Sequence, residues 1–485
     1  MRTLRCCLLS LLAGPSAVGA KHVLDDRPFC VRELPGRIES ILGQRVARTA
    51  LWGVQIHSAL RGVLYEQNPT KSFVPASNMK LVTASAALLH LGEGHRFRTM
   101  AVATSRPEDE SASACILPGR DPSLNSTGLV WLVRDFLAAR PPPRNGTVTL
   151  SVPDDVNAPP ASWENGDLEY EYGSQPNAAL VNGNVVKLNI DAGQQEGDAL
   201  TVSTESAVDA VALDHVDMRG NTGTGPPLTV QHVVDVDGIL RLRVDGSLPP
   251  NGTIKLTRAI RPPMALFLAH LRTAIRTVWS GLANTRLLPH GTACASTTPI
   301  AQIASAPVLE LLNHTLLQSD NLYAEMHLRE LGRGDAVAGL AIARASLEEL
   351  GLSDTELEGF AQVDGSGLSR HNVVSPSALV GLLRAMDGKS RLRDLLPVGG
   401  RSGTLRSRFK GTPAEGRVSA KTGTMSGVSA LSGYLVHENA STFGTVTFSL
   451  LSNGAVGSGA ALRPFQDAII VQTALARVCA NHDVP

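Results

Sequence analysis

The sequence predicts an α+β fold in which one antiparallel sheet is built from both ends of the chain. Alternating apolar residues around Trp52 and Gly62 predict an N-terminal hairpin. Further strands are expected at 418–421, 431–436 and 443–451, after a helical middle that runs from 263 to 350. Strands on both sides of a helical segment favour a sheet flanked by helices.

The chain divides into three parts. Residues 1–20 have a basic start at Arg2 and Arg5, an apolar centre and a small-residue end, which predicts a secretory signal peptide rather than an uncleaved buried helix. Residues 104–261 are rich in Gly, Pro, Asn, Asp and Thr, which is typical of a β-rich insertion. The main domain is therefore expected at 21–103 and 262–485. Because the insertion carries no catalytic motif, we expect it to shape substrate access only.

Composition limits the possible functions. The chain has 485 residues, of which 43% are hydrophobic, and its 44 basic side chains balance 44 acidic ones. This balance gives no reason to expect nucleic acid or an anionic membrane as a partner, and no later segment reads as a transmembrane helix. A secreted or periplasmic protein is expected, with its oligomeric state left open.

Six cysteines remain to be explained. Two of them lie in the predicted signal peptide, and the other four permit three disulfide pairings in an oxidising compartment: Cys30, Cys115, Cys294 and Cys479. Their spacing matches no zinc motif. No metal or cofactor is expected.

Ser77 stands at the start of a predicted helix, after Pro75 and before an Ala- and Leu-rich run. Lys80 follows three residues later, on the same helical face, so its amine can reach the Ser77 hydroxyl. A serine beside an amine is a nucleophile beside a base, provided that the pKa of the lysine is lowered. Alone, Ser-x-x-Lys more often marks an ordinary helix surface.

Two motifs far along the chain indicate that this pair is functional. Ser319-Asp320-Asn321 could by itself be a helix N-cap, and Lys421-Thr422-Gly423 could be the end of a strand. In this order, however, the three motifs are the signature of penicillin-binding proteins and class A β-lactamases.

The chain resembles the low-molecular-mass class C penicillin-binding proteins, the D-alanyl-D-alanine carboxypeptidase/endopeptidase family, from about residue 36 to the C-terminus. The shared motifs are Pro-Ala-Ser-Asn-Met-Lys, Ser-Asp-Asn-Leu, Asp-Gly-Ser-Gly-Leu-Ser-Arg-His and Ser-Ala-Lys-Thr-Gly-Thr. The long interval between Ser77 and Ser319 fits this family, which carries an insertion there. The resemblance implies a penicillin-binding transpeptidase/β-lactamase-like domain, a serine-type carboxypeptidase activity, and peptidoglycan stem peptides and β-lactams as partners.

The resemblance also assigns roles at the site. Ser77 would be acylated and Lys80 would be its base. Ser319 would relay a proton to the leaving group, and Asn321 would hold the substrate backbone or Lys80. On the strand, Lys421 would keep the site cationic, and Thr422 and Thr424 would bind the terminal carboxylate of the substrate. Gly423 would allow the peptide to approach the strand closely. The backbone N–H groups of Ser77 and Thr424 would form an oxyanion hole. Adjacent terminal helices in the family favour a Cys30–Cys479 disulfide.

Two alternatives remain open. A serine β-lactamase would need a carboxylate that activates water for rapid deacylation, and Glu356 and Glu358 lie in the expected region. They lack the expected Asn two residues beyond, and the insertion also argues against this function. A non-catalytic sensor or scaffold is the second alternative, but it would have no need of the serine and both lysines.

Overall fold

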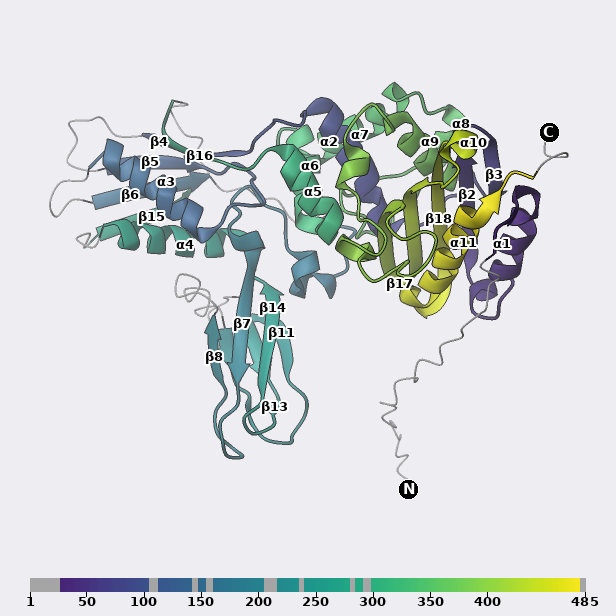
Figure 1. Cartoon of the computed structure of the whole chain (residues 1–485). Coiled ribbons are helices and arrows are strands. Elements are labelled where there is room, and N and C mark those ends of the chain that lie inside the picture. Colours follow the sequence, from purple (N-terminus) through teal and green to yellow (C-terminus); the bar gives the residue numbers. More distant parts are fainter. Residues whose placement is uncertain are drawn as a thin grey trace, which may run out of the picture.

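The computed structural model describes residues 27–103, 112–141, 147–153, 160–204, 216–234, 240–279, 284–290 and 298–479. The predicted signal peptide and Cys294 lie outside these residues. In Figure 1 the main domain, with α1, α11 and the sheet strands β17 and β18, is at the right. A second unit, with α3 and α4, is at the upper left, and a smaller group of strands is below it.

A four-stranded antiparallel sheet organises the main domain, in the order β17-β18-β2-β3. Its strands are β2 (Leu51–Ser58), β3 (Gly62–Gln67), β17 (Val418–Val436) and β18 (Thr445–Ser458). The pairing of β18 with β2 joins the two ends of the chain, as predicted. The strand predicted at 443–451 starts later, because Phe443 ends the short helix α10 (Ala440–Phe443) and Gly444 turns the chain at φ 62°.

Two helices cover one face of this sheet: α1 (Leu34–Leu42) and α11 (Arg463–Leu475). Their apolar sides pack on the sheet with Trp52 and Phe448 in a shared core. Beside them, β1 (Phe29–Cys30) pairs in parallel with β19 (Ala476–Arg477). Cys30 forms a disulfide with Cys479, with a Cα–Cα distance of 5.5 Å, which confirms the predicted pairing. Cys115 is also disulfide-bonded.

The opposite face carries the helical middle of the chain. Its helices are α2 (Met79–His90), α5 (Val308–Gln318), α6 (Asn321–Leu331), α7 (Ala336–Glu349), α8 (Asp354–Leu357) and α9 (Pro376–Met386). Helix α2 lies at the centre, and every residue from Met79 to Leu88 is buried. This explains its nearly uniform apolar sequence, because a helix surrounded by others has no solvated face.

The second unit is a five-stranded sheet in the order β15-β6-β5-β4-β16, packed against α3 (Ser126–Ala139) and α4 (Pro263–Val278). The strands are β4 (Arg98–Ala103), β5 (Ala112–Leu117), β6 (Thr147–Pro153), β15 (Asn284–His290) and β16 (Pro299–Ala304). Three of them lie outside the predicted insertion at 104–261. We therefore propose domain boundaries near residues 97 and 305.

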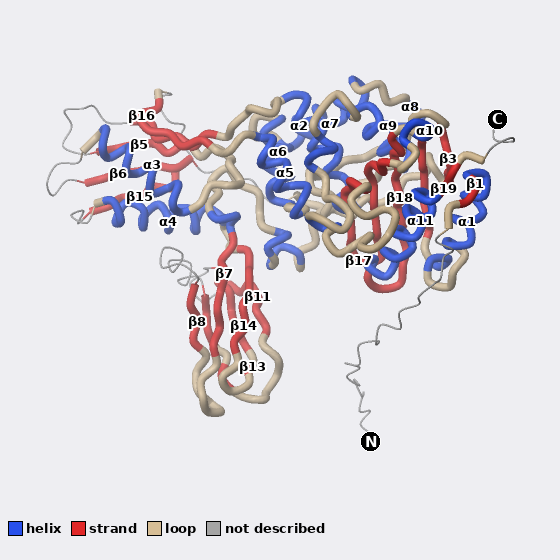
Figure 2. Tube along the Cα trace, viewed as in Figure 1, coloured by secondary structure: helices blue, strands red, loops and turns tan. Residues whose placement is uncertain are grey.

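Smaller sheets form the remaining part, drawn in red below the second unit in Figure 2. One has the order β14-β7-β8 and another the order β11-β12-β9. Their strands are β7 (Val185–Asp191), β8 (Thr201–Thr204), β9 (Val216–Met218), β11 (Thr229–Val234), β12 (Leu240–Asp245) and β14 (Thr253–Ala259), joined by the short pair β10 (Asn221–Thr222) and β13 (Ser247–Leu248). Across the part of the chain that the structure describes, no helix combines the length and apolar character needed to cross a membrane.

Candidate active site

Ser77 lies in a single 3-10 turn (Ala76–Asn78) that runs directly into α2, as the sequence predicts. The turn is tight, with Ala76 at φ 47°. Gly423 of β17 approaches it closely, because a Cβ atom at this glycine would lie 2.7 Å from the Pro75 carbonyl oxygen. Glycine at 423 thus permits the strand to pass beside the serine. The fold needs a glycine here whether or not a substrate is bound.

The Lys80 amine is completely buried and makes three hydrogen bonds. Its Nζ atom donates to Ser77 Oγ at 3.1 Å, to Asn321 Oδ1 at 2.6 Å and to the Ser366 carbonyl oxygen at 2.6 Å. Three acceptors satisfy the three donors of an ammonium group. Of the two roles expected for Asn321, the one that the structure displays is contact with Lys80.

Burial lowers the pKa of Lys80 from its ordinary value to about 8, although Asp364, Asp320 and Glu325 oppose this change. Desolvation penalises the ammonium form, whereas nearby carboxylates stabilise it. A lysine with a pKa near 8 is partly neutral at physiological pH, and its neutral form can accept a proton from the serine.

A second lysine and serine face this pair from the other side. Lys421 Nζ donates to Ser319 Oγ at 2.9 Å and to the Thr422 carbonyl oxygen at 2.8 Å. Ser319 ends α5 with a left-handed backbone at φ 64°. Burial, and then the charge of Lys80, lower the pKa of Lys421 well below its ordinary value. The structure thus shows a second lysine–serine contact besides the predicted contact between Lys80 and Ser77.

The threonines of the strand lie at the exposed side of the site. Thr422 Oγ1 donates to Thr404 Oγ1 at 2.7 Å, and an Arg463 guanidinium nitrogen donates to Thr424 Oγ1 at 3.1 Å. Arg463, at the start of α11, was not among the residues predicted from the sequence. Its position brings a further cation to the place expected for a substrate carboxylate.

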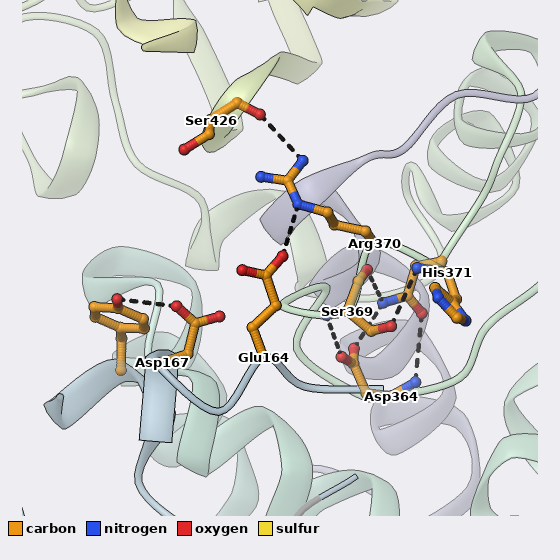
Figure 3. Close-up of polar contacts among 9 residues, drawn as sticks. Glu164, Asp167, Asp364, Ser369, Arg370, His371 and Ser426 are labelled. Atoms are coloured by element: carbon orange, nitrogen blue, oxygen red, sulfur yellow. Dashed lines mark hydrogen bonds and ion pairs between the residues drawn. The ribbon is translucent and has the colours of Figure 1, made fainter. Parts of the chain in front are cut away.

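A glycine-rich loop, 364–370, contacts Lys80 through the Ser366 carbonyl oxygen. Figure 3 shows Asp364, Ser369 and Arg370 of this loop. Asp364 accepts backbone hydrogen bonds within the loop, and its Oδ2 also accepts from Trp163 Nε1 at 2.9 Å. The Arg370 Nε atom contacts Glu164 at 3.1 Å, and its Nη1 atom donates to the Ser426 carbonyl oxygen at 3.1 Å.

Segment 160–184 thus reaches the site, although it belongs to the predicted insertion. Besides the contacts of Trp163 and Glu164, the Tyr172 carbonyl oxygen accepts from Asn321 Nδ2 at 2.8 Å. Tyr172 and Asn321 also line a cavity of about 880 Å³ that extends from Ser319 to Asn182. The sequence predicts for the insertion only an effect on substrate access, because a backbone acceptor such as the Tyr172 carbonyl oxygen leaves no signal in residue types.

No cluster of His, Cys, Asp and Glu suited to a metal ion occurs among the residues that the structure describes. The chemistry available at the site is that of a serine, two amines and two amide or hydroxyl partners. This is a constellation for nucleophilic acyl transfer.

Comparison with known proteins decides the family. Residues 34–475 match the D-Ala-D-Ala carboxypeptidase 3 (S13) family. The chain belongs to this family. Its sequence is 31% identical over 503 aligned positions to "D-alanyl-D-alanine carboxypeptidase" of an Actinomadura species, covering 96% of this chain and 89% of the relative. It is 28% identical to "Penicillin-sensitive carboxypeptidase A" of Dictyostelium discoideum, over 87% and 86% of the two chains.

Solved structures agree on the fold. Penicillin binding protein 4 of Haemophilus influenzae superposes with a TM-score of 0.77 at 21% identity, over 90% of this chain and 99% of that one. The S13 family assignment confirms the resemblance to low-molecular-mass class C penicillin-binding proteins that the motifs predicted. The protein is accordingly a serine peptidase of the D-Ala-D-Ala carboxypeptidase type.

Proposed function

We propose that Ser77 attacks the terminal peptide bond of D-Ala-D-Ala stem peptides, and the amide of β-lactams, to form a covalent acyl-enzyme. The observation that carries this proposal is the buried Lys80 amine 3.1 Å from Ser77 Oγ. Such a pair supplies both a nucleophile and its base, and peptidoglycan peptides and β-lactams are the substrates that the family and its penicillin-sensitive relative support.

The acylation step uses both lysine–serine pairs. Neutral Lys80 takes the Ser77 hydroxyl proton while Oγ bonds to the carbonyl carbon. The backbone N–H groups of Ser77 and Thr424 stabilise the oxyanion. As the C–N bond breaks, Ser319 donates its hydroxyl proton to the leaving amine and takes one from Lys421, whose Nζ atom contacts it at 2.9 Å. Water then attacks the ester and gives a proton back to Lys421, while Lys80 returns its proton to Ser77 Oγ as the acyl group leaves.

The free carboxylate of the substrate would lie against Thr422, Thr424 and Lys421. Arg463 adds a guanidinium group 3.1 Å from Thr424 Oγ1. Cationic and hydroxyl donors on one side of the nucleophile favour peptides that end in a carboxylate over internal peptide bonds. A β-lactam presents its own carboxylate in the same place, and its ring fragment remains attached after acylation.

The structure gives the β-lactamase alternative no water-activating carboxylate at Glu356. That side chain caps α8, where its Oε2 accepts from the Ser353 N–H and hydroxyl groups, each at 2.8 Å. Glu358, the other candidate, is exposed. We therefore expect slow deacylation of β-lactams.

We also propose that the protein acts outside the cytoplasm, where peptidoglycan lies, after removal of residues 1–20. The basic and apolar pattern of this segment supports the proposal. N-terminal sequencing of the secreted protein should begin at Lys21. A mature protein that still begins at Met1 would contradict signal cleavage.

Labelling with a fluorescent penicillin tests the catalytic proposal. Wild-type protein should retain the label on the peptide containing Ser77 and should release D-Ala from a D-Ala-D-Ala peptide. Ser77→Ala should lose both properties, whereas Ser72→Ala, which changes an exposed serine outside the site, should keep them. A label on another serine, or rapid turnover of a chromogenic β-lactam, would contradict the proposal.

A further inference from the structure

Glu325 is a buried carboxylate one helical turn beyond Asn321 on α6. Glu325 is only 1% exposed. The acylation steps proposed above do not use it. Its Oε1 atom accepts hydrogen bonds from the backbone N–H groups of Gly365 at 2.7 Å and Ser366 at 2.9 Å. A buried carboxylate is costly unless its hydrogen bonds are satisfied, so this placement calls for a function.

The two N–H groups belong to the loop that holds Lys80. The Ser366 carbonyl oxygen accepts from Lys80 Nζ at 2.6 Å. Gly365 has no room for a side chain, since a Cβ atom there would lie 2.7 Å from the Ala324 carbonyl oxygen. Asp364 Oδ1, within the loop, accepts from the same Ser366 N–H at 3.1 Å. Two carboxyl groups therefore fix the loop backbone at the point where it contacts the amine.

Charged groups face Lys80 from several elements. Asp320 is the N-cap of α6 and Glu325 lies within this helix. Asp364 comes from the loop and Lys421 from β17. Burial, and then Asp364, raise the pKa of Glu325 to about 8, while Arg329 on the same helix and the loop hydrogen bonds oppose this change. Glu325 therefore ionises over the same pH range as Lys80.

We propose that Glu325 is a positioning residue for acylation: its carboxyl group fixes the Gly365–Ser366 backbone that holds the Lys80 amine, and its charge governs how readily this amine loses its proton. The inference rests on the proposed role of Lys80 as the base. Each proton that leaves Glu325 creates a negative charge that stabilises the Lys80 ammonium. Loss of the Lys80 proton is consequently spread over a wider pH range than that of an isolated amine.

The test is the pH dependence of Ser77 acylation by a penicillin, measured as a second-order rate constant from pH 6 to 10. Glu325→Gln keeps an oxygen acceptor for the loop but removes the charge. The midpoint of the rising limb should move to lower pH by about one unit, and the limb should become steeper. Glu330→Gln is the matched control on the same helix, since Glu330 pairs with His95 at 3.0 Å. It should leave the midpoint unchanged.

A role confined to packing predicts another result. The rate would then fall by the same factor at every pH, and an unchanged midpoint in Glu325→Gln would overturn the proposal. Should this variant fail to fold, the coupling between Glu325 and Lys80 can be measured through the titration of Glu325, because linkage between two sites is reciprocal. In protein labelled with [δ-13C]glutamate, Lys80→Met should raise the titration midpoint of Glu325. A midpoint equal to that of wild type would overturn the proposal equally.

The experiment separates this inference from the proposed function. Penicillin that still labels Ser77→Ala would show that the proposed nucleophile is wrong. Exclusive labelling of Ser77, together with an unmoved midpoint in Glu325→Gln, would leave the function intact and reject only the role of Glu325.

Discussion

Trp163 donates a hydrogen bond of 2.9 Å from its indole Nε1 to Asp364 Oδ2, across 201 positions of sequence. The tryptophan belongs to the predicted insertion, and the aspartate belongs to the loop that contacts Lys80. The insertion therefore supports the site physically, although we expected it only to shape access. Both groups are buried, so the bond lies in an environment where an unpaired carboxylate is costly.

Replacing Trp163 with Phe should lower the stability of the protein by about 1.5–3 kcal/mol, because the hydrogen bond to a charged group is lost. The melting temperature and the rate of acylation by penicillin should both decrease. Trp131→Phe provides the control, since Trp131 is 52% exposed. Equal melting temperatures for Trp163→Phe and wild type would show that this contact contributes nothing.

Lys80→Arg should reduce acylation by about 10²–10⁴-fold, since a guanidinium group stays protonated and cannot act as a base. The loss is measured with a stopped-flow penicillin assay. Lys389→Arg, at an exposed position, should behave as wild type. Acylation by Lys80→Arg within a factor of two of wild type would exclude Lys80 as the base.

Arg463→Ala should weaken binding of peptides that end in a free carboxylate. Because this arginine is exposed, we expect a modest effect on KM, about fivefold. Peptides with a C-terminal amide should be hydrolysed equally by wild type and variant. Arg406→Ala, at another exposed arginine, is the control. An identical KM for the carboxylate peptide would exclude the proposed contact.

His327, on α6, should make the fold sensitive to acid. Burial lowers its pKa from 6.5 to about 3. Above pH 6.5 the ring is neutral in both states, but between pH 6.5 and 3 the unfolded chain binds a proton that the folded chain excludes. Stability should fall by up to about 1.4 kcal/mol per pH unit in this window.

His327→Leu should lose that part of the pH dependence, whereas His371→Asn, at an exposed position, should retain it. Unfolding free energies from denaturant titrations between pH 4 and 7 measure the slopes. A slope for His327→Leu equal to that of wild type would rule out the histidine as its source.

Residue types pointed to the proposed catalytic residues but not to the residues that support them. Ser77, Lys80 and Lys421 are recognisable because acyl transfer requires their functional groups at fixed spacings. Trp163 and Tyr172 act through an indole N–H and a backbone carbonyl, which ordinary core or turn residues also possess. A Glu inside an amphipathic helix, such as Glu325, reads as a solvated position until the structure shows it buried.

The domain boundaries that we propose from the sheet differ from the predicted ones for a similar reason. The predicted limits followed the change in composition near residues 104 and 261, whereas the five-stranded sheet recruits β4, β15 and β16 from beyond them. Strands that are far apart in the sequence can pair, so local composition does not indicate which strands share a sheet. The main sheet was predictable because its strands alternate clearly at both ends of the chain.

The pairing of β2 with β18 has a consequence for synthesis. Ser58 is opposite Val446, so the first hairpin emerges from the ribosome long before the strand that completes its sheet. Lys421 and Gly423 arrive equally late. A partly synthesised chain therefore has Ser77 but no finished site around it, and the edge of its hairpin has no partner strand until β18 is made. Penicillin would consequently label only chains whose synthesis and folding are complete.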